Sequence, residues 1–222
     1  RGALTDEILK NKPRSLSLIE KDFYLAGKLK EKYDKNFVKI YNNDILKFDI
    51  EKIINNKNSI IFGNLPYNIS SQILVKILKF KKWPPRFSDV IFMFQKELGQ
   101  KIIAKYSSSS YGRLAILSNY RLNAFNYFLI SNNCFFPKPK VSSMIIHFQP
   151  KKKIKHKIKR IDNLEKVTNS LFSKKRKMIN KSIRKILTTG NLLKLTDLNI
   201  NLRPSEITPE IYYKITELYE KK

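Results

Sequence analysis

The strongest constraint on the fold is the alternation of helical stretches with short, β-branched runs over the first 150 residues. Such alternation is typical of a parallel sheet covered by helices, because two adjacent parallel strands need a long crossover connection between them. In the stretch from Ser70 to Phe80, one helical face carries Ile73, Leu74, Ile77 and Leu78, and we expect this face to pack against the sheet. The pattern therefore predicts an α/β fold.

The expected elements follow one another closely along the chain. Strands are expected at Leu16–Glu20, Phe37–Tyr41, Ser59–Gly63, Asp89–Phe94, Ala124–Ile130 and Met144–Phe148. Helices are expected at Ala3–Asn11, Asp22–Tyr33, Ser70–Phe80, Lys96–Lys105 and Arg113–Leu122.

The pattern changes after Pro150, where strand signals stop and the chain becomes basic. Helical periodicity returns from about Asn163 to Leu187 and again from Pro209 to Glu220. Thr208 followed by Pro209 is a helix-start signal, with Thr208 as N-cap and proline at the first helical position. We therefore expect a domain of residues 1–150 and a small, basic, all-helical domain of residues 151–222.

Charge narrows the choice of partner. The 222 residues contain 45 Lys and Arg against 18 Asp and Glu, a formal net charge of +27. Residues 151–160 and 174–185 are the most basic runs, and neither contains an acid. Each run could be a solvated linker or helix face, but an excess of this size favours a polyanionic partner, above all nucleic acid.

Several other classes of protein are excluded by the composition. The single cysteine, Cys134, excludes a disulfide framework, and with only His147 and His156 beside it the chain has too few ligands for a structural zinc site. No apolar run reaches the roughly 18 to 20 residues of a membrane span. We expect a soluble, cytoplasmic protein that binds no metal.

The strongest local signal is the turn Gly63-Asn64-Leu65-Pro66-Tyr67-Asn68-Ile69-Ser70, between an expected strand and an expected helix. In α/β proteins such a turn faces the crevice where ligands bind. Pro66 pushes Leu65 into an extended conformation, so that the Leu65 carbonyl can point outward. The Asn64 side chain adds a second acceptor and Tyr67 adds a stacking ring, which together suit the exocyclic amine of a nucleobase.

Asn-Leu-Pro-Tyr resembles motif IV of the S-adenosylmethionine-dependent adenine-N6 methyltransferases, in its Asn-Leu/Ile-Pro-Tyr form. Over almost its whole length the chain resembles one branch, the ribosomal RNA small-subunit adenine N6,N6-dimethyltransferases of the KsgA/Dim type. The blocks that carry this resemblance are NLPYNIS at 64–70, FQKE at 94–97, YGRLAI at 111–116, FFPKPKVSS at 135–143 and FSKKRKMINKSI at 172–183. It implies a Rossmann-like class I methyltransferase sheet with a helical C-terminal domain.

The resemblance also implies a site for the methyl donor, S-adenosylmethionine. Gly2 would be the last glycine of the donor loop, Glu20 would accept the ribose hydroxyls, and Asp44 would receive the amino group of the donor adenine. The alternatives are a surface charge for Glu20 and a turn-capping role for Asp44. A first strand and the earlier glycines of the donor loop are expected to precede residue 1. We therefore expect this polypeptide alone to bind the donor poorly.

For the target adenine, the resemblance implies that Asn64 and the Leu65 carbonyl accept hydrogen bonds from N6 during direct displacement of the methyl group. Pro66 shapes this turn, and Asn64 also borders the donor. An adenine that leaves its stack would lie between Tyr67 and Phe135. Core packing is the alternative for both rings.

RNA contacts complete the expected site. We expect them from Arg113 and from basic residues of two family blocks, Lys138, Lys140, Lys174, Lys175, Arg176 and Lys177. The implied substrate is a pair of adjacent adenosines in a hairpin near the 3′ end of small-subunit rRNA, presented by a partly assembled subunit to a monomeric enzyme with a role in ribosome biogenesis. The alternatives are a large-subunit rRNA adenine methyltransferase, a non-catalytic RNA-binding assembly factor and a DNA adenine methyltransferase.

Overall fold

The computed structural model describes residues 2–33, 36–54 and 56–221. The chain divides into two compact units, residues 1–55 and residues 56–222. The boundary expected near residue 150 lies inside the second unit and stays a prediction. Among the described residues, no helix is long and apolar enough to cross a membrane.

The first unit contains two parallel strands and their helices. Its elements are α1 (Ala3–Lys10), β1 (Leu16–Glu20), α2 (Phe23–Lys32), β2 (Val38–Asn42) and the short 3-10 helix η1 (Ile50–Lys52). β1 and β2 run in register from the pair Leu16 and Val38 to the pair Glu20 and Asn42. Its small core is formed by Leu29, Tyr33 and Val38, against which apolar residues of α1 and both strands pack.

Gly2 begins α1 with a left-handed backbone, φ 83°. A Cβ atom at this position would lie 2.3 Å from the Tyr33 hydroxyl oxygen, so the site needs glycine for space as well as for conformation. That hydroxyl also lies 2.9 Å from the Gly2 carbonyl oxygen and 2.6 Å from Asp6 Oδ1. Tyr33 therefore ties the end of α2 to the start of α1.

The second unit is built on a four-stranded sheet in the order β3-β4-β6-β5. The strands are β3 (Ser59–Asn64), β4 (Phe87–Gln95), β5 (Leu122–Ile130) and β6 (Ser143–Pro150). β3 and β4 are parallel, but β6 runs antiparallel to both of its neighbours. The expectation of a wholly parallel sheet was therefore wrong at this end. β5 leads into β6 through residues 131–142, a connection that holds only one turn of 3-10 helix, η2 (Asn132–Cys134), and such a hairpin permits only antiparallel pairing.

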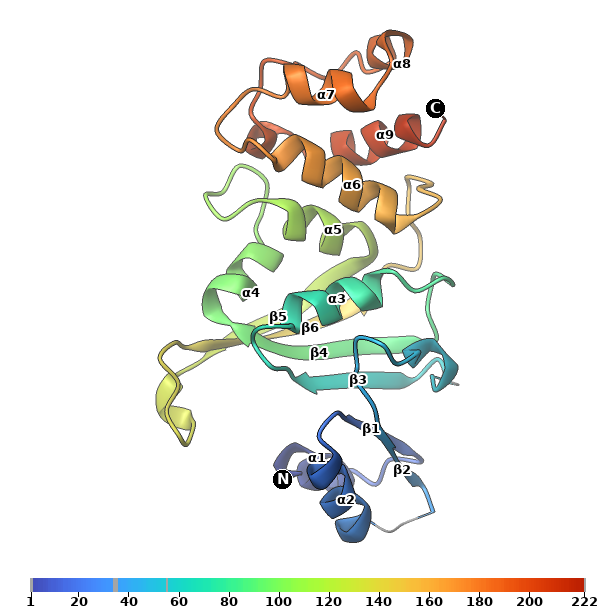
Figure 1. The fold of residues 1–222 in the computed structure, drawn as a ribbon, viewed down its shortest axis with the longest axis vertical. Helices are drawn as coiled ribbons and strands as arrows, with labels where there is room; N and C mark the ends of the chain where they lie inside the picture. Colours follow the sequence, from blue (N-terminus) through green and yellow to red (C-terminus); the bar gives the residue numbers. More distant parts are fainter. Residues whose placement is uncertain (1, 34–35, 55, 222) are drawn as a thin grey trace. The chain divides into compact units, whose positions relative to one another are not determined.

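Three helices cover one face of this sheet, α3 (Ser70–Leu78), α4 (Lys96–Ile102) and α5 (Arg113–Arg121) (Figure 1). The face of α3 that carries Ile73, Leu74, Ile77 and Leu78 is buried, which confirms the predicted apolar face. Along β6, buried side chains alternate from Met144 to Phe148, as expected when one face of the strand packs on helices. The central strand β4 is buried on both faces toward its end, where Phe92, Met93 and Phe94 are all buried.

The remaining helices form a cluster beyond α5 (Figure 1). They are α6 (Ile161–Phe172), α7 (Asn180–Ile186), α8 (Thr189–Leu193), the 3-10 helix η3 (Pro204–Glu206) and α9 (Pro209–Tyr219). α6 packs against α5, α7 and α9. α9 begins at Pro209 after the N-cap Thr208, as predicted. The single helix expected from Asn163 to Leu187 is instead two helices. The break holds four consecutive cations, Lys174–Lys177, whose mutual repulsion disfavours helix.

Contacts inside the second unit join this cluster to the sheet layer. Lys79, just after α3, pairs with Asp162 at 3.0 Å and with Glu165 at 2.7 Å, both on α6. The buried Tyr111 hydroxyl donates to the Ile207 carbonyl at 3.0 Å.

Candidate functional site

The β3–α3 turn lies at the carboxyl end of β3, where the sequence predicted a binding turn. Asn64 is the last residue of the strand, and its backbone is paired in register with Met93 of β4. Gly63 lets the chain fold closely here, because a Cβ atom at this position would lie 2.5 Å from Leu65 Cδ2 and 2.8 Å from Phe92 Cδ1. The Leu65 side chain therefore lies over Gly63.

Two acceptors of this turn have no hydrogen-bond partner in the described part of the chain. Neither the Asn64 side chain nor the Leu65 carbonyl oxygen is hydrogen-bonded to any residue that the structure describes. Asn64 is exposed and Leu65 is half-buried. The turn is nevertheless held in place, because the Ile69 amide donates to the Pro66 carbonyl at 3.1 Å. An ordered turn with two open acceptors can bind a donor such as an amine.

Tyr67 connects this turn to the sheet. Its hydroxyl lies 2.7 Å from Ser143 Oγ, and Ser143 is fully buried at the start of β6. At the other end of the residue, the Ser70 hydroxyl donates to the Tyr67 carbonyl at 3.0 Å. The half-buried ring is therefore fixed by its hydroxyl and by its backbone. This contact joins the NLPYNIS block to the FFPKPKVSS block, 76 residues further along the chain.

The rest of the FFPKPKVSS block lies in the connection between β5 and β6. Phe135 is half-buried, whereas the next residue, Phe136, is fully exposed. The connection is closed by the Asn132 side-chain amide, which donates to the Pro139 carbonyl at 3.3 Å. Lys138 and Lys140 are exposed beside it. Stacking by Phe135 stays a prediction, and the exposed Phe136 ring is a second candidate for it.

Two of the predicted donor residues, Glu20 and Asp44, lie in the first unit at the carboxyl ends of β1 and β2. Glu20 ends β1, and its Oε1 accepts the Asp22 amide at 2.9 Å. Asp44 follows β2, where its Oδ1 accepts the Leu46 amide at 2.9 Å and its Oδ2 pairs with Lys21 at 3.0 Å. The Leu46 amide, together with Lys21, lowers the pKa of this carboxyl. Asp44 therefore caps its own turn and remains ionised.

Asn42 is a residue of this edge that sequence reasoning missed. Its side-chain amide donates to the carbonyl oxygens of Glu20 and Lys21, both at 3.1 Å, and the Asn43 amide donates to the Glu20 carbonyl at 3.0 Å. The loops that carry Glu20 and Asp44 are therefore tied to each other. Asparagine directly after a strand was the available signal, but asparagine is frequent throughout this sequence.

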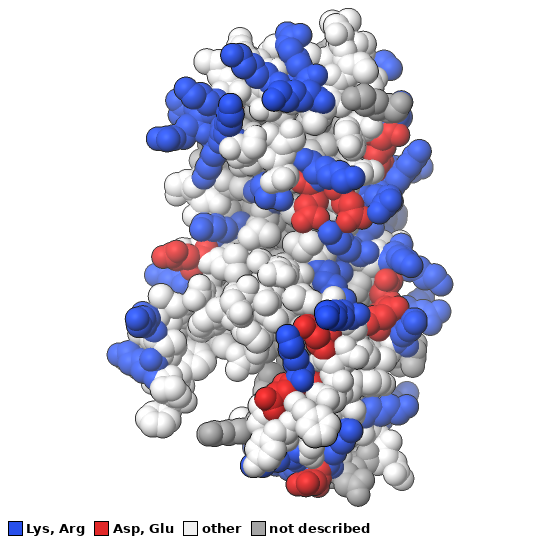
Figure 2. Space-filling model, in the orientation of Figure 1, with Lys and Arg blue, Asp and Glu red and all other residues white. Residues whose placement is uncertain are grey.

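The predicted RNA-binding residues lie in three parts of the second unit. Arg113 begins α5 and is half-buried, and its Nε atom is buried without a hydrogen bond. Lys138 and Lys140 lie in the β5–β6 connection. Lys174, Lys175, Arg176 and Lys177 are all exposed in the segment between α6 and α7. Figure 2 shows Lys and Arg side chains gathered over the region of α6–α9 and at the tip of the β5–β6 connection.

Comparison with solved structures supports a Rossmann-like methyltransferase fold. A dimethyladenosine transferase from Plasmodium falciparum matches with a TM-score of 0.66 and 21% identity, over 90% of this chain and 80% of that one. The 23S rRNA methyltransferase ErmE matches with a TM-score of 0.67 and 20% identity, over 99% of this chain and 87% of that one. These two matches place the chain in the class of Rossmann-like α/β folds.

Within this class, the model of one family, ribosomal RNA adenine dimethylase, matches residues 1–221. The ribosomal RNA small subunit methyltransferase A of Pelagibacter ubique is 42% identical over 223 residues, 99% of this chain and 83% of that protein. The protein of the same name from Coxiella burnetii (strain RSA 493 / Nine Mile phase I) is 35% identical over 220 residues, 98% of this chain and 83% of that one. The chain belongs to the ribosomal RNA adenine dimethylase family. It is therefore a methyltransferase that acts on ribosomal RNA and uses a methyl donor.

Proposed function

We propose that this enzyme transfers methyl groups from S-adenosylmethionine to N6 of two adjacent adenosines, in a hairpin near the 3′ end of small-subunit rRNA. The observation that carries the proposal is the ordered turn at the end of β3, in which the Asn64 side chain and the Leu65 carbonyl have no hydrogen-bond partner among the described residues. The names of the relatives from Pelagibacter ubique and Coxiella burnetii support the small subunit as the target.

The turn would act on the adenine amine through its two acceptors. The lone pair of this amine is delocalised into the ring, which makes N6 a poor nucleophile. Acceptors that bind both N–H groups favour the amine as it rehybridises toward tetrahedral nitrogen, so their contacts strengthen in the transition state. When bound, S-adenosylmethionine would supply the methyl group by direct displacement from its sulfonium sulfur, without a covalent enzyme intermediate. The Asn64 side chain and the Leu65 carbonyl would hold N6 while it takes the methyl group, and the N–H proton released from N6 would pass to water.

Tyr67 would hold the ring of the target adenine. A base that has left its stack needs a flat partner, and aromatic side chains supply one. The contact with Ser143 fixes the Tyr67 ring before the RNA arrives. Phe135 is proposed for the other face of the base. Pro66 would keep Leu65 extended, so that the Leu65 carbonyl is available beside the Asn64 side chain.

Residues of the first unit fit the proposed donor. S-adenosylmethionine supplies an activated methyl group on a sulfonium centre. Glu20 Oε1 is held by the Asp22 amide, which leaves Oε2 without a partner among the described residues and able to accept ribose hydroxyls. Asp44 remains ionised and could accept the adenine amino group, and Lys21, the ion-pair partner of this carboxylate, is well exposed. Gly2, at the start of α1, and Asn64 are proposed as further contacts of the donor.

Exposed cations of the second unit would bind the RNA backbone. Phosphate contacts orient a substrate without reading its sequence. We assign this role to Arg113 and to the exposed residues Lys138, Lys140, Lys174, Lys175, Arg176 and Lys177. The proposed substrate particle is a partly assembled small subunit, and the proposed enzyme is a cytoplasmic monomer.

The turn can be tested with Asn64→Ala in the complete gene product that contains this chain. Single-turnover transfer from labelled S-adenosylmethionine to small subunits that lack dimethyladenosine should slow by about 100- to 1000-fold, the range for loss of one preorganised hydrogen-bonding group. RNA affinity should be unchanged. The matched control is Asn68→Ala in the same turn, where the exposed side chain has no assigned role. Equal rates for both variants would contradict the assignment of Asn64.

A further inference from the structure

The basic linker, residues 151–160, contains no helix or strand, but its backbone is hydrogen-bonded at its start and through its second half. It leads from β6 to α6. At its start, the Lys151 amide donates to the Arg121 carbonyl at 2.8 Å, and Trp83 Nε1 donates to the Lys151 carbonyl at 3.0 Å. In its second half, the Tyr120 hydroxyl donates to the His156 carbonyl at 2.8 Å and accepts the Ile158 amide at 3.1 Å.

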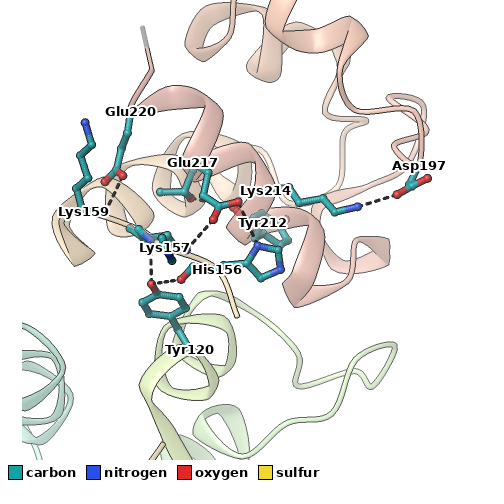
Figure 3. Close-up of polar contacts among 11 residues, drawn as sticks. Tyr120, His156, Lys157, Lys159, Asp197, Tyr212, Lys214, Glu217 and Glu220 are labelled. Carbon is teal, nitrogen blue, oxygen red and sulfur yellow. Dashed lines mark hydrogen bonds and ion pairs between the residues drawn. The ribbon is translucent and has the colours of Figure 1, made fainter. Parts of the chain in front are cut away.

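Two carboxylates of the α9 region complete this attachment (Figure 3). Glu217 accepts the Lys157 amide at 2.7 Å, and its other oxygen lies 3.2 Å from His156 Nδ1. Glu220 accepts the Lys159 amide at 2.7 Å and the Arg160 amide at 3.0 Å. Both carboxylates therefore bind backbone donors rather than lysine side chains. A linker that served only as a solvated connection would need none of these contacts.

Along the second half of the linker, side chains that are buried or half-buried alternate with side chains that are exposed. Ile158 is buried, and Ile154 and His156 are half-buried. The four lysines that alternate with these residues are exposed, and we name them the lysine row: Lys153, Lys155, Lys157 and Lys159. Within the described part of the chain, no side chain of the lysine row forms an ion pair or hydrogen bond. Four like charges thus follow one another at alternate positions, two of them on hydrogen-bonded backbone, and no acidic side chain of the described residues is bound to them.

A fixed line of unpaired cations is complementary to a regularly spaced polyanion. Repulsion within the row opposes the compact state, and an anionic strand that follows the row relieves it. Because the row is already ordered, little backbone entropy is lost when such a strand binds. We propose that the lysine row is a second binding surface for the RNA backbone, which contacts successive phosphates of one strand. This proposal rests on the proposed function and adds a surface to the RNA-binding residues assigned above.

The salt dependence of binding tests the lysine row. The variant Lys153→Gln/Lys155→Gln/Lys157→Gln/Lys159→Gln should bind small subunits more weakly, and the slope of log affinity against log salt should fall by about 3, because each phosphate contact contributes about 0.7 to 0.9. The ratio of wild-type affinity to variant affinity should therefore be about 60-fold smaller at 200 mM salt than at 50 mM salt. Protein-free rRNA and rRNA of altered sequence should give the same change, since phosphates carry no sequence information.

The matched control removes the same charge from the first unit and from the segment that leads into β3. Lys12, Lys30, Lys39 and Lys57 are exposed and have no ion-pair partner among the described residues. Their combined change to Gln should leave the slope within about 1 of the wild type. An equal loss in both variants would show a general charge effect and overturn the proposal. A loss seen only with subunits and not with protein-free rRNA would also overturn it, and would indicate an acidic protein partner instead.

A second variant tests the fixed geometry rather than the charge. Glu217→Ala/Glu220→Ala makes the protein more basic, so net charge alone would tighten binding. The proposal predicts weaker binding, with faster amide exchange at Lys157, Lys159 and Arg160. Tighter binding together with faster exchange would contradict a preorganised row. Glu7→Ala/Glu31→Ala is the control for net charge.

Methyl transfer, measured in parallel, separates this proposal from the proposed function. If the wild type methylates small subunits and the lysine-row variant keeps its affinity and slope, the proposed function stands and the lysine row is wrong. If the slope falls as expected in a protein that transfers no methyl group, the lysine row stands and the proposed function is wrong.

Discussion

At the residue scale, the candidate site depends on how Tyr67 is held. Its hydroxyl is the hydrogen-bond partner of the fully buried Ser143 side chain, at 2.7 Å. A buried hydroxyl that loses its partner destabilises the fold by about 1 to 3 kcal/mol, whereas removing both polar groups is closer to neutral. The ring is thus oriented by a contact that is also expected to stabilise the fold, and the proposed stacking on the target base would use this orientation.

This arrangement predicts a non-additive double-mutant cycle. Tyr67→Phe should lower the free energy of unfolding by about 1 to 3 kcal/mol, because Ser143 is left unpaired. Tyr67→Phe/Ser143→Ala should be less destabilising than the sum of the two single changes, by about 0.5 kcal/mol or more. Urea denaturation measures all four proteins. Strict additivity would mean that the contact does not contribute to stability.

The same residues show what sequence can establish at this scale. The turn was predictable because proline, asparagine and glycine have strong local preferences and stand next to one another at positions 63–66. The contact between Tyr67 and Ser143 was not, since it joins residues 76 positions apart and no local pattern marks it. Asp44 caps its own turn, as one of the two sequence interpretations predicted; its part in donor binding stays a prediction.

At the scale of elements, periodicity located the strands and helices well where each is buried on one face. β1 was predicted with its observed ends, and α3 with its observed start and its buried face. The antiparallel pairing of β5 and β6 was missed because the direction of a strand depends on the segment that connects it to its neighbour. The composition of the strand itself does not encode that direction. The break between α6 and α7 was missed because Ile179 and Ile183, which are buried, continue the helical spacing across the cationic segment.

One prediction at this scale concerns the attachment of α6 to the residue after α3. The hydrogen bond from Lys79 lowers the pKa of Asp162 below its ordinary value of 3.8. Because the folded state favours the ionised carboxyl, its stabilisation is fully present above about pH 4 and is lost as pH falls through the lower pKa of the folded state. Asp162→Asn should cost up to about 1 kcal/mol at pH 7, since the pair is partly exposed and screened.

Urea denaturation of the wild type and Asp162→Asn at a series of pH values from 7 to 3 measures this effect. The difference between the two proteins should shrink toward the acid end of the series. Thr189→Ala, an exposed change in α8 at a side chain with no carboxylate partner among the described residues, is a control that should show no such trend. A difference that grows on acidification would contradict the assigned direction of the pKa shift.

At the scale of the whole molecule, the net charge of +27 predicted a polyanionic partner, and the family supplies one in ribosomal RNA. Composition could not say where the cations act. In the structure, exposed cations lie in the segment between α6 and α7, in the β5–β6 connection and in the linker of residues 151–160. The backbone of the linker is bound by Glu217 and Glu220. Those two contacts span about 60 residues of sequence, so charge counting alone could not reveal the difference between a loose linker and an ordered one.

The most direct test of the central claim is methyl transfer by the complete gene product that contains this chain. Labelled S-adenosylmethionine is supplied with small or large ribosomal subunits that lack dimethyladenosine, and the modified nucleosides are identified by mass spectrometry. We predict N6,N6-dimethyladenosine in the small subunit, at two adjacent positions, and none in the large subunit. Modification confined to the large subunit, or binding to small subunits without any transfer, would contradict the account.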